Sequence, residues 1–202
     1  MTKIISIAHQ KGGVGKTTLA VNLAYCFKES MRLGLIDLDV QGSLRGLKET
    51  LSTLSMEETP KKISSIPTLP YDLIIVDTPP YLSSNLPELF NISDFILIPT
   101  KAGFLDTMAI RGTIDLVNAA QKLNSKIKAG IILNMVKPNT GLTEDVKNLL
   151  KSYNLPVLDS IISDRVSFTR SVLLGGVLNG EDHRAKDEIL NLADEIFNIM
   201  GF

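Results

Sequence analysis

Short apolar runs alternate with amphipathic stretches along almost the whole chain of 202 residues. The apolar runs are rich in Ile, Leu and Val and predict strands at residues 3–8, 32–37, 72–77, 95–99, 128–134 and 156–162. The intervening stretches have helical spacing and predict helices at residues 17–29, 83–91, 105–123, 143–153 and 185–200. Several strands are almost continuously apolar, as expected when both faces of a sheet are covered. The alternation predicts an α/β fold with a mostly parallel, twisted sheet flanked by helices on both faces.

Composition limits the organisation of this fold. Residues 47–69 mix Ser, Thr, Pro and charged residues, and we expect a short helix and a loop there rather than a linker. With 44% hydrophobic residues and a net charge of −1, residues 1–202 are expected to form a single domain. The one cysteine, Cys26, allows no internal disulfide. Neither a signal peptide nor a membrane-spanning run is recognisable, so we expect a cytoplasmic protein.

A glycine-rich segment follows the first apolar run, and it departs from the ordinary Gly-x-x-x-x-Gly-Lys-Thr phosphate loop. Gln10 occupies the position of the first glycine in that pattern. The residues expected to contact a nucleotide here are Lys11, Gly12, Gly13, Val14, Gly15, Lys16, Thr17 and Thr18. Glycines let backbone N–H groups close around phosphate oxygens, Lys16 neutralises phosphate charge, and Thr17 offers a hydroxyl to Mg²⁺. A plain glycine-rich turn is the alternative, but the strand before and the helix after favour a P-loop NTPase.

Carboxylates stand at the ends of two predicted strands. Asp37 and Asp39 follow the second apolar run, and Asp77 ends the third after four apolar residues. Parallel strands present their carboxyl ends at one edge of a sheet, where ligands bind. Each aspartate alone could equally be a helix cap or a solvated loop residue. Three of them beside a P-loop predict a magnesium and phosphate site that includes Thr17, Asp37 and Asp77.

These motifs together resemble the ParA/MinD superfamily of deviant Walker A ATPases. Residues 11–17 resemble its P-loop with an additional signature lysine at Lys11, and residues 77–80 resemble its Walker B motif. Residues 37–43 resemble its Asp-x-Asp-Pro-Gln-Gly segment, with Val40 where proline is usual. Residues 130–136 resemble the strand that carries an adenine-contacting asparagine, here Asn134. The pattern is most similar to small ParA-type partition proteins, which have no N-terminal helix-turn-helix domain.

The resemblance implies an ATP hydrolase with ATP and Mg²⁺ as cofactors. It implies a homodimer in the ATP-bound state, in which Lys11 reaches the phosphates of the other subunit. It assigns Lys11, Lys16 and Asp39 to catalysis, with Asp39 orienting the attacking water and Asp37 supporting the metal. It further implies non-specific DNA binding, a centromere-binding ParB-like adaptor that stimulates hydrolysis, and a place on the nucleoid.

Other functions within the superfamily remain open to different degrees. An iron–sulfur protein would need more cysteines than Cys26. A ligase of the same fold would need a small-molecule pocket for which the sequence offers no signal. A MinD-like protein would attach to a membrane or a protein scaffold, commonly through a basic C-terminal helix. Residues 181–202 instead carry six acids and two bases, so we expect no membrane partner. The apolar stripe of this segment is expected to pack on the sheet; it comprises Ile189, Leu192, Ala193, Ile196 and Met200.

A DNA-binding surface has modest support in the second half of the chain. Residues 121–180 contain eight Lys and Arg against four acids. The eight are Lys122, Lys126, Lys128, Lys137, Lys147, Lys151, Arg165 and Arg170. Phosphate contacts from such residues suffice for non-specific binding. A solvated basic face is an equal alternative for any one of them, and we select Arg165 and Arg170 as the first pair to test.

Overall fold

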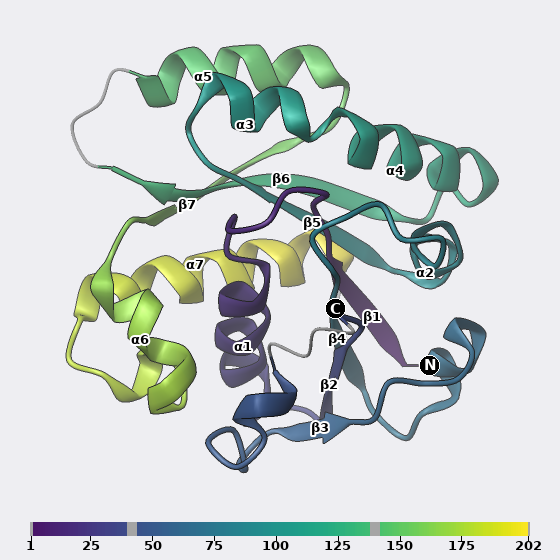
Figure 1. The fold of residues 1–202 in the computed structure, drawn as a ribbon, viewed down its shortest axis with the longest axis vertical. Helices are drawn as coiled ribbons and strands as arrows, with labels where there is room; N and C mark the ends of the chain where they lie inside the picture. The colour runs from purple at the N-terminus through teal and green to yellow at the C-terminus, as the bar shows by residue number, and fades with distance from the viewer. Residues whose placement is uncertain (1, 40–43, 138–141, 202) are drawn as a thin grey trace.

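The computed structural model describes residues 2–39, 44–137 and 142–201, and within these ranges all strands belong to one seven-stranded parallel sheet (Figure 1). The strand order is β3-β2-β4-β1-β5-β6-β7. The strands are β1 (Lys3–Ile7), β2 (Leu33–Asp37), β3 (Ser55–Glu57), β4 (Leu73–Asp77), β5 (Phe95–Thr100), β6 (Lys128–Val136) and β7 (Val157–Ser163). The α/β fold with a parallel sheet is thereby confirmed.

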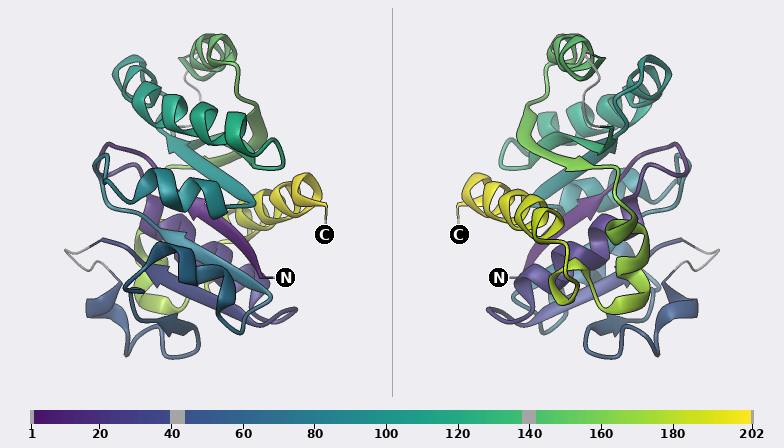
Figure 2. Two further views of the ribbon diagram at one scale, coloured as in Figure 1. Left: turned by 90° about the vertical axis from the view of Figure 1, so that its right-hand side faces the viewer. Right: turned by 90° about the vertical axis from the view of Figure 1, so that its left-hand side faces the viewer.

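Two helical layers cover the two faces of this sheet, with α4 and α5 on one side and α7 on the other (Figures 1 and 2). The helices are α1 (Lys16–Phe27), α2 (Leu86–Ile92), α3 (Phe104–Ala109), α4 (Arg111–Leu123), α5 (Leu142–Leu150), α6 (Val166–Leu174) and α7 (His183–Met200). Successive strand residues serve opposite layers: Ile5 packs with the α1 and α7 side, while Ile4 packs with the α2 and α4 side. This burial of both faces explains the continuous apolar runs.

Three elements differ from the prediction. Residues 47–69 contribute an edge strand, β3, which the mixed composition of this region does not reveal. The helix expected at 105–123 is two helices, α3 and α4, with the fully buried Ile110 between them. An additional helix, α6, follows β7. Its short length and weak amphipathicity leave little periodic signal.

The C-terminal helix α7 packs on the sheet, as predicted. Its residues Ile189, Leu192 and Ile196 are fully buried in the core beside α1 and β7. Its acids also have structural partners: Glu195 accepts the backbone N–H groups of Asp159 and Ser160, and Glu188 accepts that of Ser163. These carboxylates therefore accept hydrogen bonds from backbone N–H groups of β7, the edge strand of the sheet. No helix among the described residues is long and apolar enough to cross a membrane.

Candidate functional site

The carboxyl ends of β1, β2 and β4 meet beneath the glycine-rich loop that joins β1 to α1. A cavity of about 270 Å³ lies there. It is lined by the predicted residues Gly12, Gly13, Gly15, Lys16, Thr17, Thr18 and Asp39, together with Thr78, Pro80 and Met135. The structure thus brings most of the predicted nucleotide site together around one opening at the start of α1.

Two glycines give this loop its shape. Gly13 and Gly15 have positive φ angles of 71° and 86°, a conformation that glycine adopts without strain. At Gly15 a Cβ would lie 2.3 Å from the side-chain nitrogen of Asn134, so this turn also needs a close approach. Gly15 is the N-cap of α1 and no side chain caps the helix. The first N–H groups of α1 are therefore left to face an anion.

Lys16 lies on the floor of the loop and is only 7% exposed. Its Nζ donates to the backbone oxygen of Lys11 at 3.4 Å, within the loop itself. Burial lowers the pKa of the ammonium, and the charges of Asp77 and Asp39 partly oppose this shift. A buried cation beside a glycine-rich turn suits a phosphate group, whose charge would replace the missing hydration.

Thr17 and Asp77 form the pair expected at a magnesium site. The Thr17 hydroxyl donates to Asp77 Oδ2 at 2.5 Å, while Oδ1 of the same buried carboxylate has no hydrogen-bond partner among the described residues. Burial raises the pKa of Asp77 to about 7, and the carboxylate of Asp37 adds to the rise. An unsatisfied buried carboxylate oxygen next to a hydroxyl fits Mg²⁺, which usually binds through one or two carboxylates plus phosphates and water. Within the described part of the chain, no group of three or more His, Cys, Asp or Glu side chains has the arrangement of a metal site.

Asp37 and Asp39 have different environments. Asp37 pairs in register with Asp77 on the neighbouring strand, but its own carboxylate accepts the backbone N–H groups of Asp39 and Leu44 at 2.9 and 3.0 Å. Asp37 therefore holds the backbone at Asp39 and at Leu44. It does not line the cavity of about 270 Å³, whereas Asp39 does. Residues 40–43 of the same motif, including Val40, lie outside the described residues. The metal role of Asp37 and the water-orienting role of Asp39 stay predictions.

Asn134 lies behind the loop, where it is almost fully buried. Its side-chain nitrogen donates to the backbone oxygen of Val14 at 2.7 Å, so here it braces the P-loop. Asn134 also borders a second cavity, of about 150 Å³, on the side of β7 and α6. Thr18 and Met135 line both cavities, which makes the second one the natural place for the remainder of a nucleotide. The adenine contact of Asn134 stays a prediction.

Two of the predicted loop residues, Lys11 and Val14, do not line the cavity; Val14 is fully buried, whereas Lys11 is exposed. Its side chain is 45% exposed, and its Nζ lies 2.6 Å from Oδ1 of Asp106 on α3. Its backbone N–H donates to Nδ1 of His9 at 2.7 Å. Burial of the His9 imidazole, together with the charge of Lys16, lowers its pKa to about 4. The neutral ring can thus accept the Lys11 N–H at neutral pH.

Several residues of the site escaped the sequence analysis. Thr78, which donates to the backbone oxygen of Ile7, and Met135, with its positive φ of 54°, each follow directly after a predicted residue, so position alone could have found them. Asp106 carries no such signal, because 94 residues separate it from Lys11 in the sequence. The DNA contact considered for Arg165 stays a prediction, and the structure shows that this side chain has acidic partners of its own. Its guanidinium lies 2.8 Å from Glu188 and also faces Asp182, so its charge is largely used within the protein.

Comparisons with known proteins agree with this geometry. The family "CobQ/CobB/MinD/ParA nucleotide binding domain" matches residues 5–176. Maintenance of carboxysome distribution protein A of Halothiobacillus neapolitanus is 31% identical over 95% of this chain and 95% of its own length. The chromosome-partitioning ATPase Soj of Thermus thermophilus is 27% identical over 74% of this chain and 76% of its own length. The structure of a Cyanothece McdA–ATP complex superposes with a TM-score of 0.79 at 17% identity, covering 98% of this chain and 96% of that one.

Proposed function

The chain belongs to the CobQ/CobB/MinD/ParA family of nucleotide-binding proteins, and we propose that this ParA/MinD-type ATPase positions a cargo by binding DNA non-specifically as an ATP-bound dimer. ATP and Mg²⁺ are its cofactors, and hydrolysis of the β–γ phosphoanhydride bond of ATP by water, which yields ADP and phosphate, would drive the cycle. The observation that carries the proposal is the division of labour between two lysines of one loop. Lys16 is buried beneath the cavity, whereas Lys11 is exposed outside it.

The residues of the cavity have distinct tasks in this proposal. Lys16 offsets phosphate charge within its own subunit, and the free N–H groups of α1 hold phosphate oxygens. Thr17 and Asp77 are placed to hold Mg²⁺ when the Thr17 hydroxyl turns from the carboxylate to the ion. Asp39, which lines the same cavity, orients the attacking water. Phosphoryl transfer depends mainly on such positioning and on charge stabilisation.

Dimerisation is supported by the surface around Lys11. Five large apolar side chains are exposed on the two segments next to the loop, namely Tyr81, Leu82, Phe104, Leu105 and Met108. Their exposed fractions run from 48% to 79%. Apolar side chains gathered around a nucleotide site suit a surface that a second subunit covers once ATP is bound. In that arrangement Lys11 of each subunit would face the phosphates of the other.

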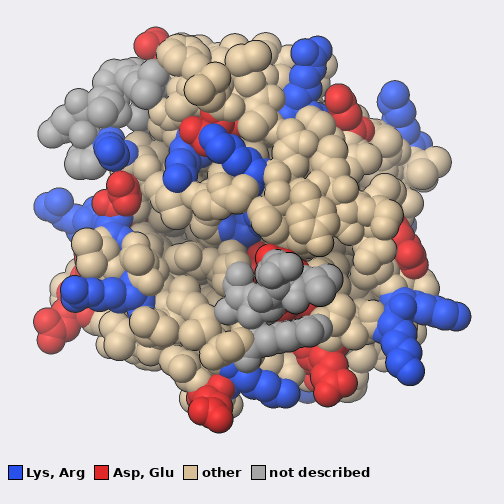
Figure 3. Space-filling view, viewed as in Figure 1, with Lys and Arg blue, Asp and Glu red and all other residues tan. Residues whose placement is uncertain are grey.

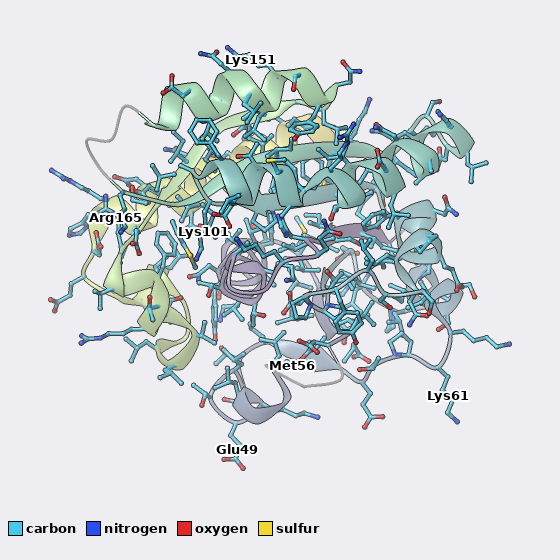
Figure 4. All side chains as sticks on the ribbon, turned by 45° about the horizontal axis from the view of Figure 1, so that its top comes forward. Glu49, Met56, Lys61, Lys101, Lys151 and Arg165 are labelled. Carbon is cyan, nitrogen blue, oxygen red and sulfur yellow. The ribbon has the colours of Figure 1, made fainter. Side chains whose placement is uncertain are left out.

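The support for DNA binding is the excess of basic residues between positions 121 and 180. These residues lie on several elements: Figure 4 shows Lys151 near the end of α5 and Arg165 at the start of α6. In Figure 3 the Lys and Arg side chains of one face are interspersed with acids rather than joined into one broad patch. Scattered contacts to DNA phosphates suit weak, salt-sensitive binding. A dimer has twice as many of these contacts and therefore binds DNA more tightly than a monomer. Arg170, which is exposed, is a better first test than Arg165.

The names of two relatives support the kind of cargo that we propose, and the adaptor is proposed from the resemblance to ParA-type proteins. One relative carries a name that refers to carboxysome distribution and another is named a chromosome-partitioning ATPase. We propose a cargo of this general kind, a plasmid, a chromosome or a large protein body, linked to the ATPase by an adaptor protein that stimulates hydrolysis, as ParB-like proteins do. The working location is the cytoplasm, on the nucleoid.

Co-sedimentation tests directly whether the protein binds DNA or a membrane. The protein is mixed with long double-stranded DNA or with anionic liposomes, each in the presence of Mg²⁺ with ADP or with a non-hydrolysed ATP analogue. We expect sedimentation with DNA only, only with the ATP analogue, and with a steep loss as salt rises. Arg170→Ala should weaken this binding, whereas Arg184→Ala, which removes a likewise exposed arginine from the acidic segment 181–202, should leave it unchanged. Sedimentation with liposomes and not with DNA would instead favour a MinD-like protein.

A further inference from the structure

Helix α3 is attached to the first half of the P-loop by polar contacts. Asp106 holds the Lys11 ammonium at 2.6 Å, and the side-chain amide of Gln10 donates to the backbone oxygen of Ala109 at the end of the same helix. The backbone of Lys11 is fixed separately by its bond to His9. The backbone N–H and the side-chain ammonium of Lys11 therefore both have partners inside the same subunit.

The acceptor of this contact is better buried than the donor. The Asp106 side chain is 17% exposed, against 45% for Lys11. Gly103 leaves room for it, because a Cβ at that position would lie 2.9 Å from Asp106 Oδ2. Lys11 is thus the more exposed member of the pair, and its side chain has more room to change partner.

Helix α3 itself has little anchoring. Of its six residues only Thr107 is buried, and Phe104, Leu105 and Met108 are 54%, 79% and 65% exposed. An element with few buried apolar contacts opens at low free-energy cost. The same helix therefore carries the carboxylate that holds Lys11 and three of the apolar side chains proposed to meet a second subunit.

We propose that Asp106 is a positioning residue that retains Lys11 within its own subunit before dimerisation and competes for it with the phosphates of the nucleotide in the partner subunit. This inference rests on the proposed function of Lys11 in the dimer. Dimerisation then exchanges one ion pair for another: Lys11 leaves Asp106 and meets the more highly charged phosphates. Asp106 raises the threshold for pairing, so that subunits without nucleotide stay apart.

The expected size of this effect is modest, because the pair is partly exposed. Such pairs change an equilibrium by roughly 1.5-fold to 5-fold. Each dimer releases two of them, so removing the carboxylate is expected to tighten dimerisation by roughly 2-fold to 30-fold. The gain is expected to shrink at high salt, which screens an exposed ion pair in the monomer.

Sedimentation velocity with Mg²⁺ and a non-hydrolysed ATP analogue measures the dimer dissociation constant at low and high salt. Asp106→Asn removes the charge, Asp106→Glu restores a carboxylate, and Asp115→Asn removes an exposed acid from the neighbouring helix α4 as the matched control. We expect tighter dimerisation for Asp106→Asn at low salt alone. The dimer dissociation constant of Asp106→Glu is expected to be closer to that of wild type, and the dissociation constant of Asp115→Asn is expected to equal that of wild type.

A double-mutant cycle on the nucleotide-free monomer supplies an independent measurement. Lys11→Met and Asp106→Asn should be non-additive in the free energy of unfolding, since each removes the same ion pair. Additive effects would overturn the inference, as would an Asp106→Asn dimer that is no tighter than wild type. A wild-type protein that stays monomeric with the analogue would contradict the proposed function, and this inference with it. A wild-type dimer with an unimproved Asp106→Asn variant would overturn this inference alone.

Discussion

The two halves of the P-loop, each with one lysine, have opposite environments. Around Lys16 the loop is buried: Asn134 bonds Val14, Thr17 bonds Asp77, and Gly15 leaves no room for a methyl group. Around Lys11 the loop is exposed and is held by a lightly anchored helix through an ion pair. Two identical side chains five residues apart therefore differ in what holds them and in what they can reach.

This difference explains why one loop carries two cations. A buried lysine keeps one position and suits a phosphate that binds in the same subunit. An exposed lysine on a movable contact can change partner when a second subunit arrives. The environments, and not the residue types, assign the roles.

The largest expected effect is the loss of the buried cation. Lys16→Ala should abolish nucleotide binding in practice, lowering affinity by about 100-fold or more, because buried contacts between charged groups contribute up to about 3 kcal/mol. Titration with a fluorescent ATP analogue measures this. If Lys16→Ala bound the ATP analogue with nearly wild-type affinity, there would be no basis for giving Lys16 and Lys11 different roles.

A substitution of Asp39 in the buried half of the site is expected to change ATP hydrolysis without changing ATP binding. Asp39→Ala should lower the hydrolysis rate by roughly 10²-fold while ATP affinity, dimer formation and DNA retention persist, since only the orientation of water is lost. The ATPase rate and ATP affinity are measured on the same preparation. Normal hydrolysis in this variant, with loss in Asp77→Ala, would reverse the roles given to these carboxylates. Loss of ATP binding would move Asp39 to the metal site.

Alanine variants of Gly13 and Gly15, which both have positive φ angles, compare the stability cost of a side chain in the two halves of the loop. Gly13→Ala should cost roughly 1–2 kcal/mol of stability from its left-handed backbone alone. Gly15→Ala should cost at least about 1 kcal/mol more, because its methyl group would displace Asn134 from Val14. Thermal and chemical unfolding without nucleotide compare the pair. Equal losses would mean that the close approach of Asn134 contributes nothing.

The smallest expected effect is the pH dependence that His9 adds to the exposed half. Because burial lowers its pKa to about 4 in the fold, the unfolded chain binds a proton first as pH falls below 6.5. Stability from this group is therefore complete above pH 6.5 and declines towards pH 4. Between pH 7 and 5, wild type should lose roughly 1–2 kcal/mol more than His9→Asn, whose amide oxygen can accept the Lys11 N–H. Parallel pH profiles for the two proteins would show that His9 does not stay neutral.

Local pattern was sufficient to predict most of the fold and the buried half of the site. Apolar runs identified six of the strands in the described chain, and the spacing from Lys11 to Thr17 predicted the loop that the structure places over the cavity. The edge strand β3 was missed because three partly exposed residues carry no apolar run. Helix α6 was not among the predicted helices because it is less amphipathic than the equally long α5.

The exposed half of the site depends on contacts that no local pattern contains. Asp106 meets Lys11 only because α3 lies beside the P-loop in the folded chain. Arg165 was selected as a DNA contact from its sign of charge, but α7 brings Glu188 to it. The adenine contact predicted for Asn134 stays a prediction, whereas its bond to the P-loop backbone could not be read from the sequence. Tertiary packing decides which charges remain available.

The central claim is that Lys16 serves its own subunit and Lys11 serves the other. Sedimentation velocity of wild type and Lys11→Ala, each with Mg²⁺ and either ADP or a non-hydrolysed ATP analogue, tests it most directly when nucleotide affinity is measured on the same samples. The account predicts that wild type is a monomer with ADP and a dimer with the analogue. It predicts that Lys11→Ala binds the analogue with near wild-type affinity, stays monomeric and does not hydrolyse ATP. A Lys11→Ala protein that dimerises as wild type does, or a wild type with one mass in every nucleotide state, would contradict the claim.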